Sequence, residues 1–212
     1  QAYPLIVELF SLPLDEEWFV EVTEDMIDKL GRILASVSGG DDSLIKSLIE
    51  NEKAFQYARC QAISALVSLV ASGDKSREEV LAYFKTLFQT QLKQEPSNSK
   101  VLEYLVKHAS ALYPTELYDD IKQVYEKGLV ESLFISLEHV ENQLTLQQER
   151  VLKRLPRNYT LIDDALAEMK NSMFSFTTPE DTELSSALVE LTINTGIFPS
   201  EALTKPSLFR SK

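Results

Sequence analysis

The spacing of apolar residues is the feature that most constrains what this chain can fold into. Apolar side chains recur every three or four positions, as at Val80, Phe84 and Leu87. This spacing places side chains on one face of an α-helix, whereas a half-buried strand needs strict alternation. Almost no stretch of strand length alternates in this way. The sequence therefore predicts an all-α chain.

Capping residues, glycines and prolines divide the pattern into consecutive short helices, because Ser and Thr favour helix starts while Gly and Pro follow helix ends. The predicted helices lie at about residues 4–13, 23–39, 43–50, 54–71, 76–92, 101–112 and 115–127, from 136, at 145–155 and 161–174, with a further start at 178–181. The last segment, from Asn194, is expected to be partly irregular because prolines interrupt it.

Several helix starts carry a specific prediction. Thr23 and Ser43 are expected to be N-caps, and the pairs Ser76–Glu79 and Thr145–Gln148 have the spacing of capping boxes. In a capping box, each side chain binds the free backbone N–H of the other residue. Asp163 and Asp164 are expected near a first helical turn, where acidic side chains favour the positive end of the helix dipole.

Short helices in consecutive pairs are typical of an α-solenoid or of an irregular helical bundle. The helix ends at Gly39, Gly73 and Pro114 lie roughly 34 to 41 residues apart, a spacing found in two-helix repeats. The sequence therefore favours a right-handed superhelical stack of antiparallel helix pairs. We expect one domain over 1–175 and a C-terminal helical extension over 176–212.

Segment 44–69 resembles one HEAT-type repeat, with an apolar first helix, a polar turn at Asn51 and Glu52, and Arg59 early in the second helix. Further motifs resemble a bacterial family of uncharacterised proteins, the domain-of-unknown-function family numbered 1186. They are Tyr3–Val7, Ile33–Val37, Arg77–Val80 with Tyr83–Phe84, Leu112–Leu117 and Gly128–Val130, and the resemblance covers about residues 2–145. It implies a HEAT-like α-solenoid and supplies no function.

The charge balance excludes some partners and favours others. The chain carries 33 acidic residues against 21 Lys and Arg, a net charge of -12. Nucleic-acid binding requires clustered Lys and Arg side chains to neutralise the phosphates, so no nucleic-acid partner is expected. Eight acidic residues, from Glu8 to Asp28, precede the first base, Lys29, and we expect this block to favour a basic partner. The one basic cluster, Arg150, Lys153, Arg154 and Arg157, is expected to be a solvated helix face, with an anion or acidic-partner site as the alternative.

The single cysteine and the hydropathy bear on location. Cys60 cannot form an internal disulfide, and its register with Ile63 and Val67 predicts a core position. A chain without disulfides is typical of a reducing compartment, so a cytoplasmic location is expected. No run of about 18 uncharged apolar residues is present, so no membrane span is expected. The sequence leaves the oligomeric state open.

The chain offers little for catalysis or metal binding. A zinc site needs three or four ligands at short spacing, and the candidates are His108, His139 and Cys60. The sequence has neither a Gly-x-Ser-x-Gly motif nor a glycine-rich phosphate loop. We therefore expect no catalytic residue, metal or cofactor. The alternative is an enzyme of unknown class whose carboxylates, such as Glu116 with Asp119 and Asp120, converge in a groove and have a raised pKa.

One polar stripe is a candidate binding surface. Tyr57, Gln61, Ser64 and Ser68 lie on one face of the helix over 54–71, and Tyr104 and His108 lie four apart on the helix over 101–112. In a solenoid, second helices of successive repeats line the concave face. We therefore predict a non-catalytic scaffold or adaptor that binds a protein or peptide through Tyr57, Gln61, Tyr104 and His108. The alternative is an ordinary solvated face.

Overall fold

The computed structural model describes residues 2–13, 24–91, 100–131 and 134–168. The chain divides into two compact units, Gln1–Asp163 and Asp164–Lys212. Only 164–168 of the second unit are described, so the predicted division at 175 lies outside the described residues. All regular secondary structure in the described ranges is helical, which confirms the all-α prediction.

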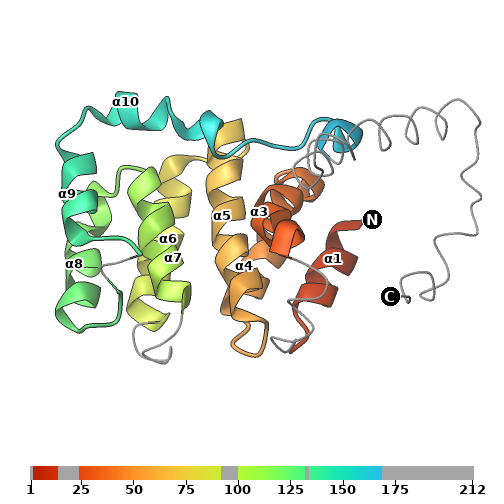
Figure 1. Cartoon of the computed structure of the whole chain (residues 1–212), viewed down its shortest axis with the longest axis horizontal. Helices are drawn as coiled ribbons and strands as arrows, with labels where there is room; N and C mark the ends of the chain where they lie inside the picture. Colours follow the sequence, from red (N-terminus) through yellow and green to blue (C-terminus); the bar gives the residue numbers. More distant parts are fainter. Residues whose placement is uncertain (1, 14–23, 92–99, 132–133, 169–212) are drawn as a thin grey trace, which may run out of the picture. The chain divides into compact units, whose positions relative to one another are not determined.

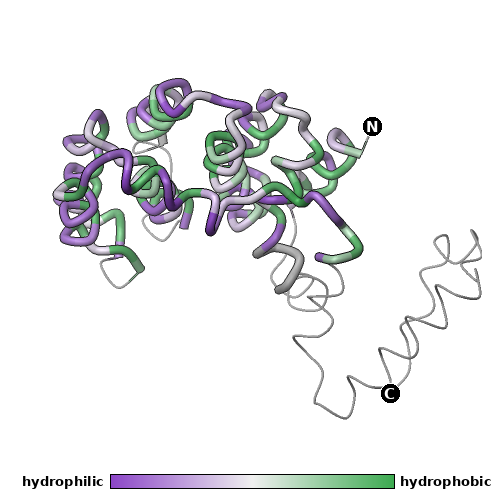
Figure 2. The backbone as a smooth tube through the Cα atoms, turned by 90° about the horizontal axis from the view of Figure 1, so that it is seen from above, coloured by the Kyte–Doolittle hydropathy of each residue, from purple (hydrophilic) through white to green (hydrophobic). Residues whose placement is uncertain are grey.

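The described helices occur in the order shown in Figure 1. They are α1 (Ala2–Phe10), α3 (Glu24–Ser38), α4 (Ser43–Glu50), α5 (Gln56–Ser72), α6 (Arg77–Gln91), α7 (Lys100–Ala111), η1 (Thr115–Leu117), α8 (Tyr118–Glu126), α9 (Leu137–Leu144), α10 (Gln148–Leu152) and η2 (Leu155–Arg157). Most predicted helices lie within a few residues of these bounds. Figure 2 shows hydrophobic and hydrophilic residues interleaved along the helices, as amphipathic spacing requires.

Helix α5 is the centre of the first unit and packs against α3, α4 and α7. Its core residues include Cys60, which is fully buried as predicted. The approach of α3 is close at Gly31, where an added Cβ would lie 2.9 Å from the carbonyl oxygen of Gln61 and 3.0 Å from Cβ of Ser64. Glycine at this position therefore lets the two helix backbones come together.

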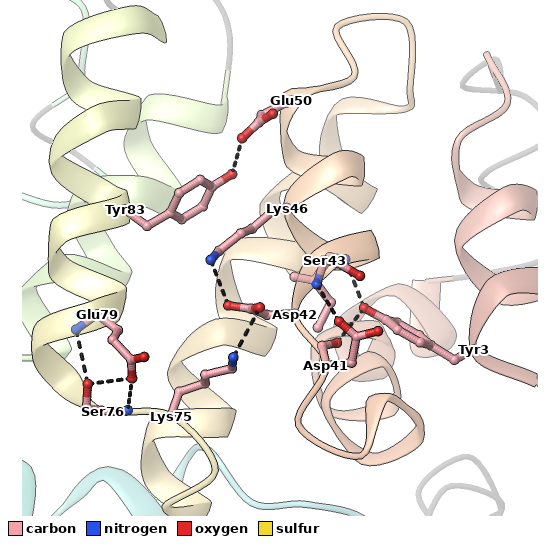
Figure 3. Close-up of polar contacts among 11 residues, drawn as sticks. Tyr3, Asp41, Asp42, Ser43, Lys46, Glu50, Lys75, Ser76, Glu79 and Tyr83 are labelled. Carbon is pink, nitrogen blue, oxygen red and sulfur yellow. Dashed lines mark hydrogen bonds and ion pairs between the residues drawn. The ribbon is translucent and has the colours of Figure 1, made fainter.

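Two of the predicted helix starts are confirmed. The Glu79 N–H donates to Ser76 Oγ at 3.2 Å, and the Ser76 N–H donates to Glu79 Oε2 at 3.0 Å (Figure 3). The Ser76 hydroxyl also donates to Glu79 Oε2, at 2.6 Å, and the hydrogen bonds from this hydroxyl and from the Ser76 N–H lower the pKa of the Glu79 carboxyl. At the start of α9, Ser136 Oγ accepts the N–H of His139 at 3.1 Å. In both helices, a serine hydroxyl that accepts a nearby backbone N–H marks the helix start.

Two other cap predictions are wrong. Ser43 is the first residue of α4, and its own N–H donates to Asp41 Oδ1 at 3.0 Å. Thr145 ends α9 instead of starting α10, since its hydroxyl donates to the carbonyl of Asn142 at 2.8 Å. Ser and Thr hydroxyls bind backbone groups on either side of them, so the residue type alone does not decide which helix is capped. Thr23 lies outside the described residues.

The helix predicted at 161–174 begins later. Residues 161–163 are not helical, and the helical residues start at 165. Asp164 Oδ1 accepts the N–H groups of Leu166 and Ala167, which confirms the expected position of this acid at a helix start. The remainder of that prediction and the start at 178–181 lie outside the described residues.

Buried arginines close the ends of two helices, whose last carbonyl groups have no partner within the helix. Arg59 is 3% exposed, and its Nε donates to the carbonyl of Ile49 at 2.9 Å, joining α5 to α4. Arg77 Nε donates to the carbonyl of Leu112 at 2.7 Å, joining α6 to the end of α7. Its terminal nitrogens bind the carbonyl of Tyr113 and the carboxylate of Glu116.

Paired charges and two phenol groups connect the neighbouring helices α1, α4 and α6 (Figure 3). Asp42 binds Lys46 at 2.8 Å and Lys75 at 3.2 Å. The hydroxyl of Tyr83 donates to Glu50 at 2.9 Å. On the other side of α4, the Tyr3 hydroxyl donates to the carbonyl of Asp41 at 2.8 Å. These polar groups all have partners and fix the positions of the helices.

Candidate functional site

Two adjoining hollows lie beside α7. The α5–α7 hollow has a volume of about 450 Å³ and is lined by Gln61, Ser64, Tyr104, Lys107, His108, Asn158 and Tyr159. The α7–α10 hollow has a volume of about 310 Å³ and is lined by Lys107, Ser110, Ala111, Ile135, His139, Gln143, Val151, Arg154, Leu155, Asn158 and Tyr159. Both hollows share Lys107, Asn158 and Tyr159, so this trio forms the wall between them.

The α5–α7 hollow brings together three of the four residues predicted to bind a partner. Gln61 comes from α5, and Tyr104 and His108 come from α7. Tyr57 does not line the hollow; its ring is half-buried and lies 5.5 Å from the ring of Phe55. The four-residue step from Tyr57 to Gln61 keeps both side chains on one helix face but places them one turn apart.

The polar stripe is partly buried, since Tyr57, Ser64 and Tyr104 are half-buried and the other three residues are more deeply buried. Gln61 is 8% exposed, His108 is 4% exposed, and Ser68 is fully buried. The reason is that α5 has packing neighbours on several sides, including η2, so even its polar residues lie in contact with other elements. Ser68 satisfies its hydroxyl locally by donating to the carbonyl of Ser64 at 3.3 Å.

His108 is a buried neutral group. Its Nδ1 lies 3.0 Å from the hydroxyl of Tyr159, and its Nε2 has no hydrogen-bond partner among the described residues. Burial lowers the pKa of His108 to about 3, and the positive charge of Lys107 adds to this. Burial also raises the pKa of Tyr159 to about 12. Both shifts favour the uncharged form of each group near pH 7, and in this form the pair offers hydrogen bonds.

An aromatic ledge lies beside the α5–α7 hollow. The rings of Tyr104 and Phe134 are stacked with centroids 5.1 Å apart, and Phe134 is 41% exposed. The Lys107 ammonium lies 5.1 Å from the Tyr104 centroid and 5.4 Å from that of Phe134, within the range of a cation–π interaction. The sequence does not predict Phe134 at this site, because nothing in the local pattern relates it to Tyr104, 30 residues earlier.

The segment 158–162 completes both hollows. Arg32 Nε donates to the carbonyl of Thr160 at 3.0 Å, and the Ile162 N–H donates to Ser36 Oγ at 2.8 Å, so the segment is bound to α3. Figure 1 shows this part of the chain running from α10 past the end of α5 towards α3. Asn158 and Tyr159 are not predictable from the sequence either, because they lie in a short non-helical stretch without periodicity.

The carboxylates proposed for an enzyme do not meet in either hollow. Glu116 binds Arg77 through both oxygens, at 2.7 and 2.8 Å, and this contact lowers the pKa of Glu116. A lowered pKa is the opposite of what a general acid at neutral pH needs. No carboxylate lines either hollow. In the described ranges, no group of three or more His, Cys, Asp and Glu residues is arranged to hold a metal ion.

The basic cluster does not form one helix face, because α10 ends at Leu152 and the separate turn η2 begins at Leu155. Arg150, Lys153 and Arg157 are exposed and line neither hollow. Arg154 is also exposed, but it lines the α7–α10 hollow. The cluster therefore separates into three solvated side chains and one with a place at a cavity.

Comparison with known proteins gives a family and no activity. A family model described as "Protein of unknown function (DUF1186)" matches residues 1–176. An uncharacterized protein of Chlamydia muridarum (strain MoPn / Nigg) is 38% identical over 180 residues, covering 83% of this chain and 70% of that protein. One of Chlamydia trachomatis serovar D is 37% identical over 180 residues, covering 83% and 69%. No solved structure matches the chain. No helix in the described part of the chain is long and apolar enough to cross a membrane.

Proposed function

We propose that this chain, which belongs to the DUF1186 family, is a non-catalytic helical-repeat scaffold or adaptor that binds a protein or peptide. The binding surface would be the α5–α7 hollow with the aromatic ledge of Tyr104 and Phe134. The proposed place of action is the bacterial cytoplasm. The fold proposed for it is a HEAT-like α-solenoid in which α4 pairs with α5 and α6 with α7.

Two packing observations support the solenoid. Helix α5 contacts both α3 and α7, as expected if second helices of successive pairs stack side by side. Helix α4 contacts α1 and reaches α6 through the hydrogen bond from Tyr83 to Glu50. Arg59 also has a role that the resemblance suggests, since it joins the second helix of a pair to the end of the first.

The observation that carries the binding proposal is the combination of a polar hollow and an exposed aromatic ring. Gln61, Asn158 and the unpartnered Nε2 of His108 offer hydrogen-bonding groups to a partner's backbone or polar side chain. Phe134 supplies apolar contact area beside them. Aromatic groups next to specific polar contacts are typical of protein interfaces.

The charge of the hollow refines which partner group is expected there. Lys107 is the only Lys, Arg, Asp or Glu residue that lines this hollow, so a neutral or acidic partner side chain is favoured at this position. The acidic block before Lys29 favours a basic partner, but 14–23 lie outside the described residues. We therefore assign the basic preference to that block and not to the hollow.

Site-specific photo-crosslinking tests the proposal. A photoreactive phenylalanine analogue at Tyr104 is expected to capture a discrete protein partner in the native cell. The same analogue at Tyr118 is the matched control, because Tyr118 is also half-buried but lies on α8 and lines neither hollow. Capture at Tyr104 and not at Tyr118 would support the proposal. No capture at Tyr104, or the same products at both positions, would contradict it.

A further inference from the structure

We propose that the α7–α10 hollow binds a small organic oxyanion, a carboxylate or phosphate group on a compact apolar body, whose charge is neutralised by Lys107 and Arg154. This inference goes beyond the proposed function, because it concerns the second hollow and a small molecule. It rests on the charges, on one buried hydroxyl group and on the apolar floor.

The charges around this hollow are unusual for so acidic a chain. Lys107 and Arg154 both line it, and no carboxylate does. Neither side chain has an ion pair or hydrogen bond with a carboxylate among the described residues. Several buried or half-buried cations elsewhere are paired with carboxylates, as in Lys46 with Asp42 and Arg77 with Glu116. Two cations without a carboxylate partner at one cavity, in a chain with a net charge of -12, form a local positive site that attracts an anion.

Ser110 supplies an independent indication of a ligand. The residue is 1% exposed and lines the hollow, and its Oγ has no hydrogen-bond partner in the described ranges. A buried hydroxyl group without a partner destabilises the folded state. An oxyanion in the hollow would accept a hydrogen bond from this group. Lys107 and Ser110 are three residues apart on α7, so both lie on the face that borders the cavity.

The remaining lining residues fit an anionic group joined to an apolar one. The amides of Gln143 and Asn158 are further donors for oxygen atoms. The floor consists of Ile135, Val151 and Leu155, all of which are buried core residues. A volume of about 310 Å³ exceeds that of a bare phosphate or carboxylate and leaves room for an apolar body on this floor.

Three probes that share a benzene ring distinguish binding that depends on negative charge from binding that depends on shape alone. We expect benzoate or phenyl phosphate to cause saturable chemical-shift changes at Ser110 and Arg154 in NMR titrations of the full chain. Benzyl alcohol, the neutral analogue, is expected to cause none. Binding of benzoate alone would identify a carboxylate ligand, and binding of phenyl phosphate alone a phosphate ester. Absence of saturable changes with both anions, or equal binding of benzyl alcohol, would overturn the proposal.

Two variants with a matched control complete the test. Arg154→Gln is expected to weaken binding of the anionic probe at least tenfold, because a charged hydrogen bond is lost. Arg150→Gln makes the same charge change on the exposed side of α10 and is expected to weaken binding less than twofold. Ser110→Ala should weaken binding severalfold without lowering the thermal midpoint. Equal losses for the two arginine variants would contradict the site. Crosslinking at Tyr104 is expected to survive Arg154→Gln, since Tyr104 does not line this hollow.

Discussion

The surroundings of Arg77 and of Arg154 differ in one respect that separates a structural site from a binding site. Arg77 is buried, and its three side-chain nitrogens bind the carbonyls of Leu112 and Tyr113 and the carboxylate of Glu116. Arg154 lies at a hollow without any carboxylate. Both sites adjoin the C-terminal half of α7. Satisfied polar groups hold the fold together, whereas unsatisfied ones retain their capacity to bind another molecule.

The largest expected loss of stability follows from removing the hydrogen bonds of Arg77. Arg77→Met would leave the carbonyls of Leu112 and Tyr113 without their donor, and buried unpaired groups are costly. We expect the free energy of unfolding to fall by about 3 kcal/mol in urea denaturation. Arg154→Met is the matched control and should change it by less than about 0.5 kcal/mol. Similar losses for both variants would show that the comparison is wrong.

The next largest effect is a pH dependence of stability that comes from His108. Because burial lowers its pKa to about 3 in the folded state, against 6.5 for an ordinary histidine, the unfolded chain binds the extra proton first. Stability is therefore complete above pH 6.5 and falls as the pH drops towards 3. The slope contributed by this group is up to about 1.4 kcal/mol per pH unit.

Urea denaturation between pH 7 and 5 measures this slope. His108→Gln should show a shallower pH dependence than the wild type, because the titrating group has been removed. His139→Gln, the same change at an exposed side chain, is expected to follow the wild-type profile. If His108→Gln also follows the wild type, His108 is not held neutral by the fold.

The smallest expected change in stability distinguishes two buried serines, Ser110 and Ser68. Ser110→Ala removes a hydroxyl group that has no partner, so stability should be unchanged or rise by up to about 1 kcal/mol. Ser68→Ala removes a buried hydroxyl group that binds the carbonyl of Ser64, and stability should fall by about 1 kcal/mol. Thermal unfolding of both variants compares them directly. A loss for Ser110→Ala that equals the loss for Ser68→Ala would mean that the Ser110 hydroxyl is satisfied in the free protein.

Local interactions account for what could be predicted from the sequence. Three-and-four spacing and the Ser76–Glu79 capping box depend on residues close in the chain, and both are confirmed. The face shared by Gln61 and Ser64 is also a local property, and these residues do line one hollow. Thr145 ends α9 and does not begin α10, because its hydroxyl donates to the carbonyl of Asn142.

Long-range contacts account for what could not be predicted. Tyr159 reaches His108 across 51 residues, and nothing in the stretch around Tyr159 indicates that it packs on α7. The burial of the polar stripe depends equally on η2, which packs against α5 from a distant part of the chain. The roles of Arg77 and Arg154 depend on whether a carboxylate lies nearby in space. The number and order of charged residues in the sequence do not show which of the two arginines has such a neighbour.

The segment 158–162 has a consequence for the order in which this protein acquires its binding capacity. Its hydrogen bonds to α3 and to His108 place the last-made part of the first unit over helices that were synthesised much earlier. A nascent chain that has left the ribosome only as far as α9 would contain α3, α5 and α7 but neither hollow. Ligand binding would then begin only after synthesis has passed Ile162, so an occupied hollow would report that the first unit is complete.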